Sequence, residues 1–272
     1  MSAASNVDER CRVLRSLHVP GRPLILPNAW DAASARAVVA AGFPAVATTS
    51  AGVAATLGFE DHESAPSAEM LAAAARIASA VDVPVTVDAE SGYGLNAEAL
   101  AAALLNAGAA GCNLEDTDHR SGVLRKPDDQ AARLEAVRAA ADRLDFPMVL
   151  NARIDVFIRA PDVDQGALLS EALARATAYL AAGVDCVYPI ALRDRAVIEA
   201  FVEGASGAVN VLASPAAPPI VELAAIGVAR ISYGSSIHDG LMDELIGFLE
   251  GRRDRLGGAA APLRPRAEHE DA

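Results

Sequence analysis

Two carboxylates stand at the end of one apolar segment, where the chain turns into a glycine-rich loop. In residues 83–94, VPVTVDAESGYG, a valine-rich run ends at Asp88 and Glu90. These two acids are two positions apart, so their side chains lie on the same face while the chain is extended. Buried carboxylates are costly unless a cation or hydrogen-bond donors receive them. Oxygen ligands of this kind suit Mg²⁺ or Mn²⁺. Alternatively, both could be ordinary loop acids, one capping a turn and one solvated.

Short apolar segments alternate with helical segments eight times along the chain. The expected strands are residues 24–27, 44–48, 83–87, 111–114, 147–151, 185–188, 210–213 and 229–233. The expected helices are residues 31–41, 67–80, 96–107, 129–144, 165–182, 193–202, 216–226 and 235–249. The 272 residues also match the length of about 250 residues that is typical of a TIM-type (β/α)8 barrel. We therefore predict an α/β protein with a single such barrel, and a doubly wound open sheet is the alternative.

The barrel is expected to cover residues 1–256 as the catalytic domain. A short amphipathic helix within residues 1–20 would precede the repeating pattern. Residues 257–272, GGAAAPLRPRAEHEDA, have the composition of a disordered tail.

Polar residues recur at the C-terminal ends of the expected strands, which is where barrel active sites lie. They are Thr49, Ser50 and Gly52 after strand two, Asp88 and Glu90 after strand three, Glu115 and Asp116 after strand four, and Asn151 and Arg153 after strand five. Several carboxylates facing one arginine could hold Mg²⁺ or Mn²⁺ and bind a small anionic substrate beside it. Asn210 is expected at the start of strand seven and is left out of the site. Residues 49–64 are expected to form a long loop that opens and closes.

The composition narrows the classes of function. A net charge of −13 without a basic run argues against nucleic acid or an anionic membrane as a partner. We expect a cytoplasmic protein, because the N-terminal residues lack the apolar region of a signal peptide and no apolar stretch is long enough to span a membrane. The three cysteines Cys11, Cys112 and Cys186 are expected to be reduced, buried thiols.

Two other cofactor chemistries are not indicated. Gly92 and Gly94 do not form a GxGxxG motif, so a nucleotide cofactor is not expected. Lys126 is the only lysine and is expected in a loop, which disfavours Schiff-base chemistry. Trp30 follows the first strand and could line the pocket or pack under the barrel rim.

Four motifs resemble those of the isocitrate lyase and phosphoenolpyruvate mutase superfamily. They are SAGVAATLGFED at 50–61, DAESGYG at 88–94, NLED at 113–116 and LNARID at 150–155. The resemblance extends over about residues 24 to 250 and implies the same barrel, usually with the last helix swapped between subunits of a homodimer or homotetramer. Members of the superfamily make or break C–C or P–C bonds next to a carboxylate, often through a pyruvyl enolate held on Mg²⁺.

The resemblance also implies a role for each matching residue. Asp88 would bind the metal directly, and Glu90 and Glu115 would hold it directly or through water. Arg153 would bind the substrate carboxylate or the oxyanion, and Asp61 would lie on a closing loop as a catalytic residue. The pyruvyl carboxylate would be bound by Thr49, Ser50, Ala51 and Gly52.

The loop after strand four departs from the lyases of this superfamily. They carry a cysteine in a Lys-Lys-Cys-Gly-His or Lys-Arg-Cys-Gly-His motif, whereas this loop reads TDHRSGVLRKP and offers His119, Arg120, Arg125 and Lys126. His119 could transfer a proton or bind an anion, or it could be solvated. Those lyases also carry a glutamate after strand six, where this chain has Tyr188, Pro189 and Ile190.

The leading hypothesis is a Mg²⁺-dependent enzyme that cleaves a C–C bond in a small 2-oxo or 2-hydroxy acid, as a lyase or decarboxylase. The alternative enzyme performs P–C chemistry, as a phosphoenolpyruvate or carboxyphosphonoenolpyruvate mutase or a phosphonopyruvate hydrolase. A non-catalytic barrel that binds a metabolite is a third reading, and a closing aspartate argues against it.

Overall fold

The computed structural model describes residues 3–255, so the tail expected at 257–272 lies outside the described residues. The strands are β1 (Leu24–Leu26), β2 (Asn28–Ala29), β3 (Val46–Thr48), β4 (Val85–Asp88), β5 (Gly111–Glu115), β6 (Thr117–Asp118), β7 (Val123–Leu124), β8 (Val149–Ile154), β9 (Cys186–Pro189), β10 (Ala208–Leu212) and β11 (Arg230–Ser232). The helices are α1 (Ala3–Ser16), α2 (Ala32–Ala40), α3 (Ser50–Leu57), α4 (Ser67–Ser79), α5 (Ala97–Asn106), α6 (Pro127–Asp142), α7 (Val156–Arg159), α8 (Gln165–Ala181), α9 (Arg195–Gly204), α10 (Ile220–Ile226) and α11 (Ser236–Arg255).

The nine main strands form one parallel sheet that closes into a barrel. Their order is β1-β11-β10-β9-β8-β5-β4-β3-β2. The first and last strands in this order are two parts of one chain segment, separated only by Pro27. Before Pro27 the segment pairs with β11, and after it with β3. The sheet is therefore a TIM-type (β/α)8 barrel with a divided first strand, as predicted from the sequence.

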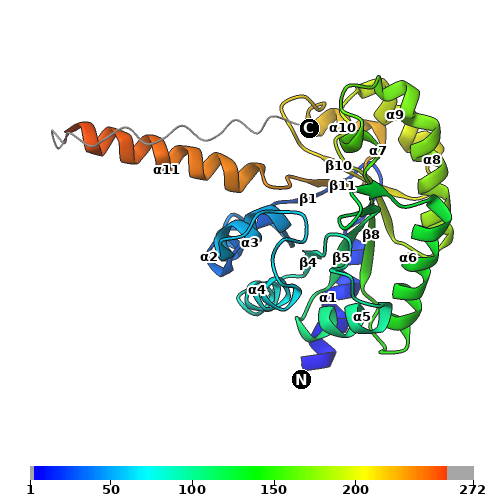
Figure 1. Ribbon diagram of the computed structural model, residues 1–272, viewed down its shortest axis with the longest axis horizontal. Helices are drawn as coiled ribbons and strands as arrows, with labels where there is room; N and C mark the ends of the chain where they lie inside the picture. Colours follow the sequence, from blue (N-terminus) through cyan, green and yellow to red (C-terminus); the bar gives the residue numbers. More distant parts are fainter. Residues whose placement is uncertain (1–2, 256–272) are drawn as a thin grey trace. The chain divides into compact units, whose positions relative to one another are not determined.

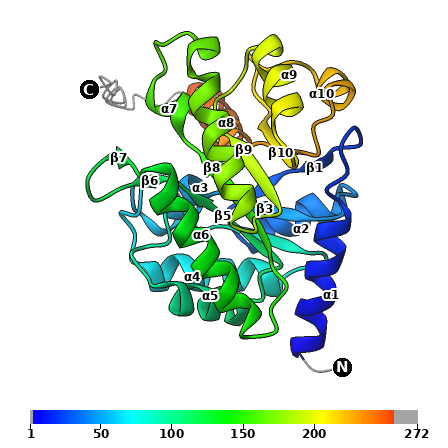
Figure 2. The same cartoon turned by 90° about the vertical axis from the view of Figure 1, so that its right-hand side faces the viewer.

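Helices surround the sheet in chain order. Contacts link α4 to α5, α5 to α6, α6 to α8 and α8 to α9, and Figure 1 shows α5, α6, α8 and α9 following one another around the outside. The view in Figure 2 faces α6 and α8, with β5 and β8 behind them. Such a helical layer covers the outer face of a parallel barrel, as expected for repeated β-α units.

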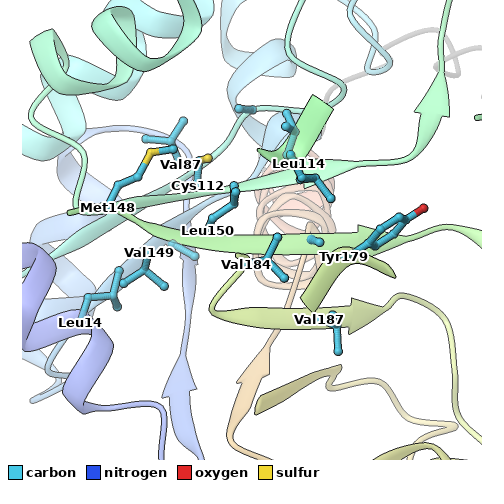
Figure 3. Close-up of a cluster of buried hydrophobic side chains, with 14 of the residues drawn as sticks. Leu14, Val87, Cys112, Leu114, Met148, Val149, Leu150, Tyr179, Val184 and Val187 are labelled. Atoms are coloured by element: carbon cyan, nitrogen blue, oxygen red, sulfur yellow. The ribbon is translucent and has the colours of Figure 1, made fainter. Parts of the chain in front are cut away.

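The apolar core lies between the strands and these helices. Side chains of Val87, Cys112 and Leu150 belong to one buried cluster (Figure 3), and they occupy neighbouring register positions on β4, β5 and β8. Because side chains alternate along a strand, Asp88 and Asn113 point to the opposite face. The interior of the barrel is accordingly polar, and it opens toward the C-terminal ends of the strands.

Helix α1 packs across the N-terminal end of the barrel. Leu14 is fully buried and lies near Val149 (Figure 3). Arg15 donates from Nε to Asp185 Oδ1 at 2.8 Å and from Nη2 to the Met148 carbonyl at 3.0 Å. These contacts join the helix to β8 and leave the opposite end of the barrel free for the site.

Several element bounds differ from those expected. Residues 50–57 form helix α3 instead of a loop, because an alanine-rich run is terminated by Gly58 in the left-handed region at φ 86°. Strand β8 continues to Ile154, so Arg153 lies within the strand and not after it. In β10 the residue Asn210 is central instead of first. The helix expected at 216–226 begins only at Ile220, after two prolines.

Contacts divide the chain into residues 1–238 and residues 239–272. The boundary lies inside α11, so the described part of the second unit is the continuation of that helix. No helix within residues 3–255 is both long enough and apolar enough to cross a membrane.

Candidate active site

A cavity of about 290 Å³ lies at the C-terminal ends of the barrel strands. Six residues predicted for the site line it: Thr49, Ser50, Ala51, Asp61, Asp88 and Arg153. The other lining residues were not predicted for the site, and they include Asn28, Asn113, Tyr188, Ser232 and Tyr233. The parallel strands bring these residues together because their C-terminal ends meet at one rim.

Asp88 is the last residue of β4 and is held by its neighbours on both sides. Its backbone N–H donates to Thr48 Oγ1 at 2.8 Å, and its Oδ2 accepts from the Ser50 N–H at 3.1 Å. The second bond comes from the first turn of α3, where free backbone N–H groups favour a negative charge. One carboxylate oxygen is thus fixed, and Oδ1 is left for a ligand.

Arg153 lies between two carboxylates. It donates to Asp155 from Nε at 2.6 Å and from Nη2 at 3.0 Å, and its Nη1 lies 2.6 Å from Glu115 Oε2. These partners raise the pKa of Arg153 further and outweigh the effect of its burial. A guanidinium has five N–H donors, so two remain for an anionic ligand in the cavity.

Glu115 is the last residue of β5 and is almost fully buried. Its second oxygen, Oε1, is hydrogen-bonded to His119 Nε2. Burial raises the pKa of Glu115 to about 7, although Arg153 and His119 oppose this change. Burial by itself would lower the pKa of His119, but the contact with Glu115 reverses the sign and raises it. A proton can therefore be shared between these two groups near neutral pH.

Glu90 is covered by the segment that follows α3. Its Oε1 accepts from the Glu63 N–H at 2.5 Å, and Glu63 Oε1 in turn accepts from Ser91 Oγ at 2.7 Å and from the Tyr93 N–H at 2.6 Å. Burial raises the pKa of Glu90 to about 8, and the nearby Asp88 contributes. The segment is thus bonded directly over the acidic motif at 88–94.

The covering segment has a strained backbone. His62 and Glu63 are consecutive non-glycine residues with positive φ, at 68° and 57°, a conformation that costs roughly 1–3 kcal/mol per residue. Asp61 lies in the same segment, lines the cavity and has a buried Oδ1 without a hydrogen-bond partner. The predicted 49–64 loop is shortened by α3, and the opening and closing of its remainder, which contains Asp61, stays a prediction.

A buried ion network supports the wall from behind. Asp116 Oδ2 accepts from Arg175 Nη1 at 3.0 Å and from the Tyr179 hydroxyl at 2.7 Å, while its Oδ1 accepts from the Asp155 N–H at 2.9 Å. Because Asp155 holds Arg153, helix α8 positions the guanidinium through two intermediate residues. Asp116 therefore stabilises the cavity wall from behind and does not line the cavity.

Five predicted site residues lie outside the cavity wall: Gly52, Glu90, Glu115, His119 and Asn151. Asn151 is fully buried, and its Nδ2 donates to Asn113 Oδ1 at 2.7 Å, so it lies one step behind the wall. Gly52 lies inside α3, where a Cβ would come within 3.0 Å of Trp30 Cβ. His119 borders a neighbouring cavity and contacts His62, with ring centroids 5.1 Å apart.

Other predictions about side chains can also be compared with the structure. Trp30 is buried against His238, with ring centroids 5.0 Å apart, so it packs under the rim and does not line the cavity. The three cysteines are free and buried, as expected. Burial raises the pKa of Cys112 to about 12, which makes it an inert thiol. Lys126 is exposed, so nothing desolvates it as Schiff-base chemistry would require.

The acids fit a loosely held magnesium ion better than a closed protein cage. Within the described range, no three His, Cys, Asp or Glu side chains lie together as a metal cluster, so the positions of Asp88, Glu90 and Glu115 favour one direct ligand over a cage of three. Mg²⁺ usually keeps several waters and takes only one or two carboxylates. The free oxygen of Asp88 suits direct binding, and Glu90 and Glu115 could accept hydrogen bonds from its waters.

These features define a TIM-type barrel with an acidic cavity at its C-terminal rim, and Arg153 is the one arginine among the residues that line it. The chain belongs to the phosphoenolpyruvate phosphomutase family, whose sequence model matches residues 14–249. It is therefore a member of the isocitrate lyase and phosphoenolpyruvate mutase superfamily, which comprises Mg²⁺-dependent lyases and mutases.

Relatives of this chain carry the names of both reaction classes. A crystal structure from Burkholderia cenocepacia J2315, provisionally named a phosphonomutase, is 46% identical with a TM-score of 0.85 and covers 89% of this chain and 99% of that one. Probable 2-methylisocitrate lyase 2 of Corynebacterium glutamicum is 33% identical over 207 residues, which are 74% of this chain and 65% of the relative. The chloroplastic carboxyvinyl-carboxyphosphonate phosphorylmutase of Arabidopsis thaliana is 36% identical over 182 residues, 63% of this chain and 52% of the relative.

Proposed function

We propose that this chain cleaves a C–C bond in a small 2-oxo or 2-hydroxy acid, as a Mg²⁺-dependent lyase or decarboxylase acting through a pyruvyl enolate. The observation that carries the proposal is the charge of the cavity wall. Arg153 is the one guanidinium among the residues that line it, and no lysine does. Oxaloacetate carries about two negative charges and phosphonopyruvate between two and three, so a wall with a single guanidinium fits the less charged 2-oxo acid better.

Arg153 and the start of α3 would then bind different oxygens of the substrate. Arg153 binds the carboxylate or the enolate oxygen with its two free N–H donors. The start of α3 presents the hydroxyl groups of Thr49 and Ser50 and the Ala51 N–H to a second oxygen, because the Ser50 N–H is already bonded to Asp88. The volume of about 290 Å³ suits a compact ligand, since it lies at the lower limit for small-molecule sites.

Bond cleavage needs a place for an electron pair and a source for one proton. In decarboxylation, the bond from C3 to the departing carboxyl carbon breaks, CO₂ leaves, and the electron pair forms the enolate. C3 then takes a proton from water or from Asp61 on the covering segment. When bound by Asp88, Mg²⁺ would supply Lewis-acid stabilisation of the developing negative charge.

His119 is proposed as a proton-transfer group beside Glu115. It occupies the loop in which the lyases of the superfamily carry their cysteine, and it reaches the cavity only past His62. Arg120 lines the neighbouring cavity with His119. A group at this distance is less suited to deprotonating a substrate hydroxyl, which favours 2-oxo acids over methylisocitrate.

P–C chemistry is the second candidate, and the 46% identical structure provisionally named a phosphonomutase favours it. The full-length protein should be assayed with Mg²⁺ on oxaloacetate, methylisocitrate, dimethylmalate and phosphonopyruvate, following pyruvate and phosphate release. We expect kcat/KM for a 3-carboxylated 2-oxo acid to exceed that for methylisocitrate by about a hundredfold, the scale of a missing general acid or base. Phosphate release from phosphonopyruvate without turnover of oxaloacetate would transfer the assignment to P–C chemistry.

We also propose that the protein works as a homodimer or homotetramer. Helix α11 exposes six large apolar side chains over two turns: Leu241, Met242, Leu245, Ile246, Phe248 and Leu249. A cluster of this kind on one helix is typical of a surface that another chain covers. The superfamily resemblance, in which the last helix is exchanged between subunits, supports the same reading.

A further inference from the structure

A buried arginine lies beneath the cavity without an acidic partner. Arg230 in β11 is fully buried, and its Nε and Nη1 have no hydrogen-bond partner. Within residues 3–255 no carboxylate lies within ion-pair distance of it, and burial lowers its pKa. An uncompensated cation inside a barrel is costly, so this side chain is not explained by packing alone.

The contact that Arg230 does make fixes the orientation of Asn113. Arg230 Nη2 donates to Asn113 Oδ1 at 3.1 Å, and Asn151 Nδ2 donates to the same oxygen at 2.7 Å. An amide can usually be turned by 180° with little change in shape, but a guanidinium can only donate. The atom of Asn113 that faces Arg230 must therefore be its oxygen.

With its oxygen held in this way, Asn113 has its NH₂ group left for the cavity. Asn113 lines the cavity and is the register partner of Asp88 on the neighbouring strand. Both side chains project from the same face of the sheet. An amide donor thus lies beside the carboxylate that is suited to the cation, and a buried positive charge lies behind it.

We propose that Asn113 binds the substrate, donating from Nδ2 to a carboxylate or enolate oxygen, and that Arg230 is the positioning residue that holds this amide in the donating orientation. The proposal rests on the function proposed above and adds a second anion-binding group to Arg153. The proposal also gives a reason for burying the Arg230 charge without an acidic partner. That charge stabilises a negatively charged ligand on the cavity side of Asn113.

The direct test measures binding of oxalate, a planar dianion that resembles a pyruvyl enolate, to the full-length protein in saturating Mg²⁺. Asn113→Leu removes the donor without adding charge, and Asn113→Asp keeps the acceptor for Arg230 and Asn151 while removing the donor. Both should weaken oxalate binding by about 10- to 100-fold, the range for a hydrogen bond to a charged group. Neither should weaken Mg²⁺ binding, which is titrated separately. Asn106→Asp on the exposed end of α5 is the control and should bind oxalate normally.

Arg230 is tested through its effect on Asn113. Arg230→Met should weaken oxalate binding by about tenfold, and Arg230→Lys, which can still donate, should restore it to within about threefold of the wild type. If Arg230 acts through Asn113, the double variant Asn113→Leu with Arg230→Met should bind no more weakly than Asn113→Leu alone. Thermal unfolding of each variant identifies any that has lost its fold, and the Asn113→Asp and Arg230→Lys variants retain the buried bond.

The outcomes separate this inference from the proposed function. If the wild type binds oxalate and both Asn113 variants bind it within twofold, Asn113 is not a substrate-binding residue and the proposed function stands. Additive losses in the double variant would remove the positioning role of Arg230. If the wild type binds Mg²⁺ but no oxalate, the enolate chemistry and the inference built on it are both wrong.

Discussion

Asp88 and Glu115 are both acids at the ends of strands, but their hydrogen-bond and ion-pair partners suit them to different roles. Asp88 has one oxygen bound by a backbone N–H and another left for a ligand. Glu115 has both oxygens occupied, by His119 and Arg153. Asp88 is therefore the residue suited to direct cation binding, and Glu115 orients the arginine and the histidine.

Removal of the Asp88 carboxylate should abolish binding of divalent cations and activity together. Asp88→Ala leaves only the more enclosed Glu90 and Glu115, which are suited to metal-bound water and not to direct ligation. Calorimetric titration with Mg²⁺ measures the effect, with the exposed acid Asp82 as the matched control in Asp82→Ala. Unchanged Mg²⁺ affinity in Asp88→Ala would remove the central assignment of the site.

Asp61 should matter for turnover more than for binding. Asp61 lines the cavity, and its buried Oδ1 has no hydrogen-bond partner among the described residues, so no other contact of that oxygen competes with a bound ligand. Asp61→Ala is expected to lower kcat by about 100-fold, the scale of a proton-transfer group, with a much smaller change in the oxalate Kd. The exposed neighbour Glu60 provides the control Glu60→Ala. A large loss of affinity with normal turnover at saturation would reduce Asp61 to a contact residue.

At the scale of elements, helix α3 decides how the ligand meets the backbone. Its first turn presents the Ser50 N–H to Asp88 and places Thr49 and Ala51 in the cavity wall. The position of this turn depends on close packing at Gly52, where a Cβ would lie 2.7 Å from Thr49 Cγ2. A glycine is needed there for space and not for backbone conformation.

The substitution Gly52→Ala should therefore destabilise the protein although alanine favours helices. Overpacking of this kind costs about 1–3 kcal/mol, more than the roughly 1 kcal/mol gained from helix propensity. Gly240→Ala in α11 is the matched control, since no atom lies within 4 Å of its added Cβ, and it should be neutral or stabilising. Urea unfolding compares the two. Equal stability of both variants would show that the contact at Gly52 is relieved without cost.

At the scale of the whole molecule, the closed barrel accounts for the position of the site, and the exposed apolar side chains of α11 are the basis of the proposed assembly. Pro27 divides the first strand, so its two parts pair with opposite neighbours and close the sheet. The apolar side chains of α11 have no comparable role within the barrel.

A charge placed among the apolar side chains of α11 should break up the proposed assembly. Leu245→Asp with Ile246→Asp puts two carboxylates at positions that are 47% and 51% exposed, where a partner chain would have to bury them at high cost. Light scattering coupled to gel filtration should show a dimer or tetramer for the wild type and a smaller species for the variant. Val221→Asp, at an exposed position of α10, is the control. A monomeric wild type would contradict the proposed assembly.

The sequence by itself determined the barrel and the acidic rim. Alternating apolar and helical segments require a parallel sheet, and parallel strands bring their C-terminal residues to one end. Asp88, Arg153 and the residues after strand two could therefore be predicted for one site, because each follows or ends a strand that local pattern reveals. Helix α3 was missed because its alanine-rich run stands between segments with loop composition.

Only the tertiary structure decided which polar groups face the ligand and which stand behind them. Asn113 and Arg230 are 117 residues apart in sequence, and neither position carries a local signal of their contact. Asn151 was expected at the rim as the last residue of its strand, but β8 continues to Ile154 and Asn151 is buried. Register and barrel closure set how deep each side chain lies in the barrel. The pairing of a buried cation with an amide depends on contacts between distant strands, which no local pattern in the chain encodes.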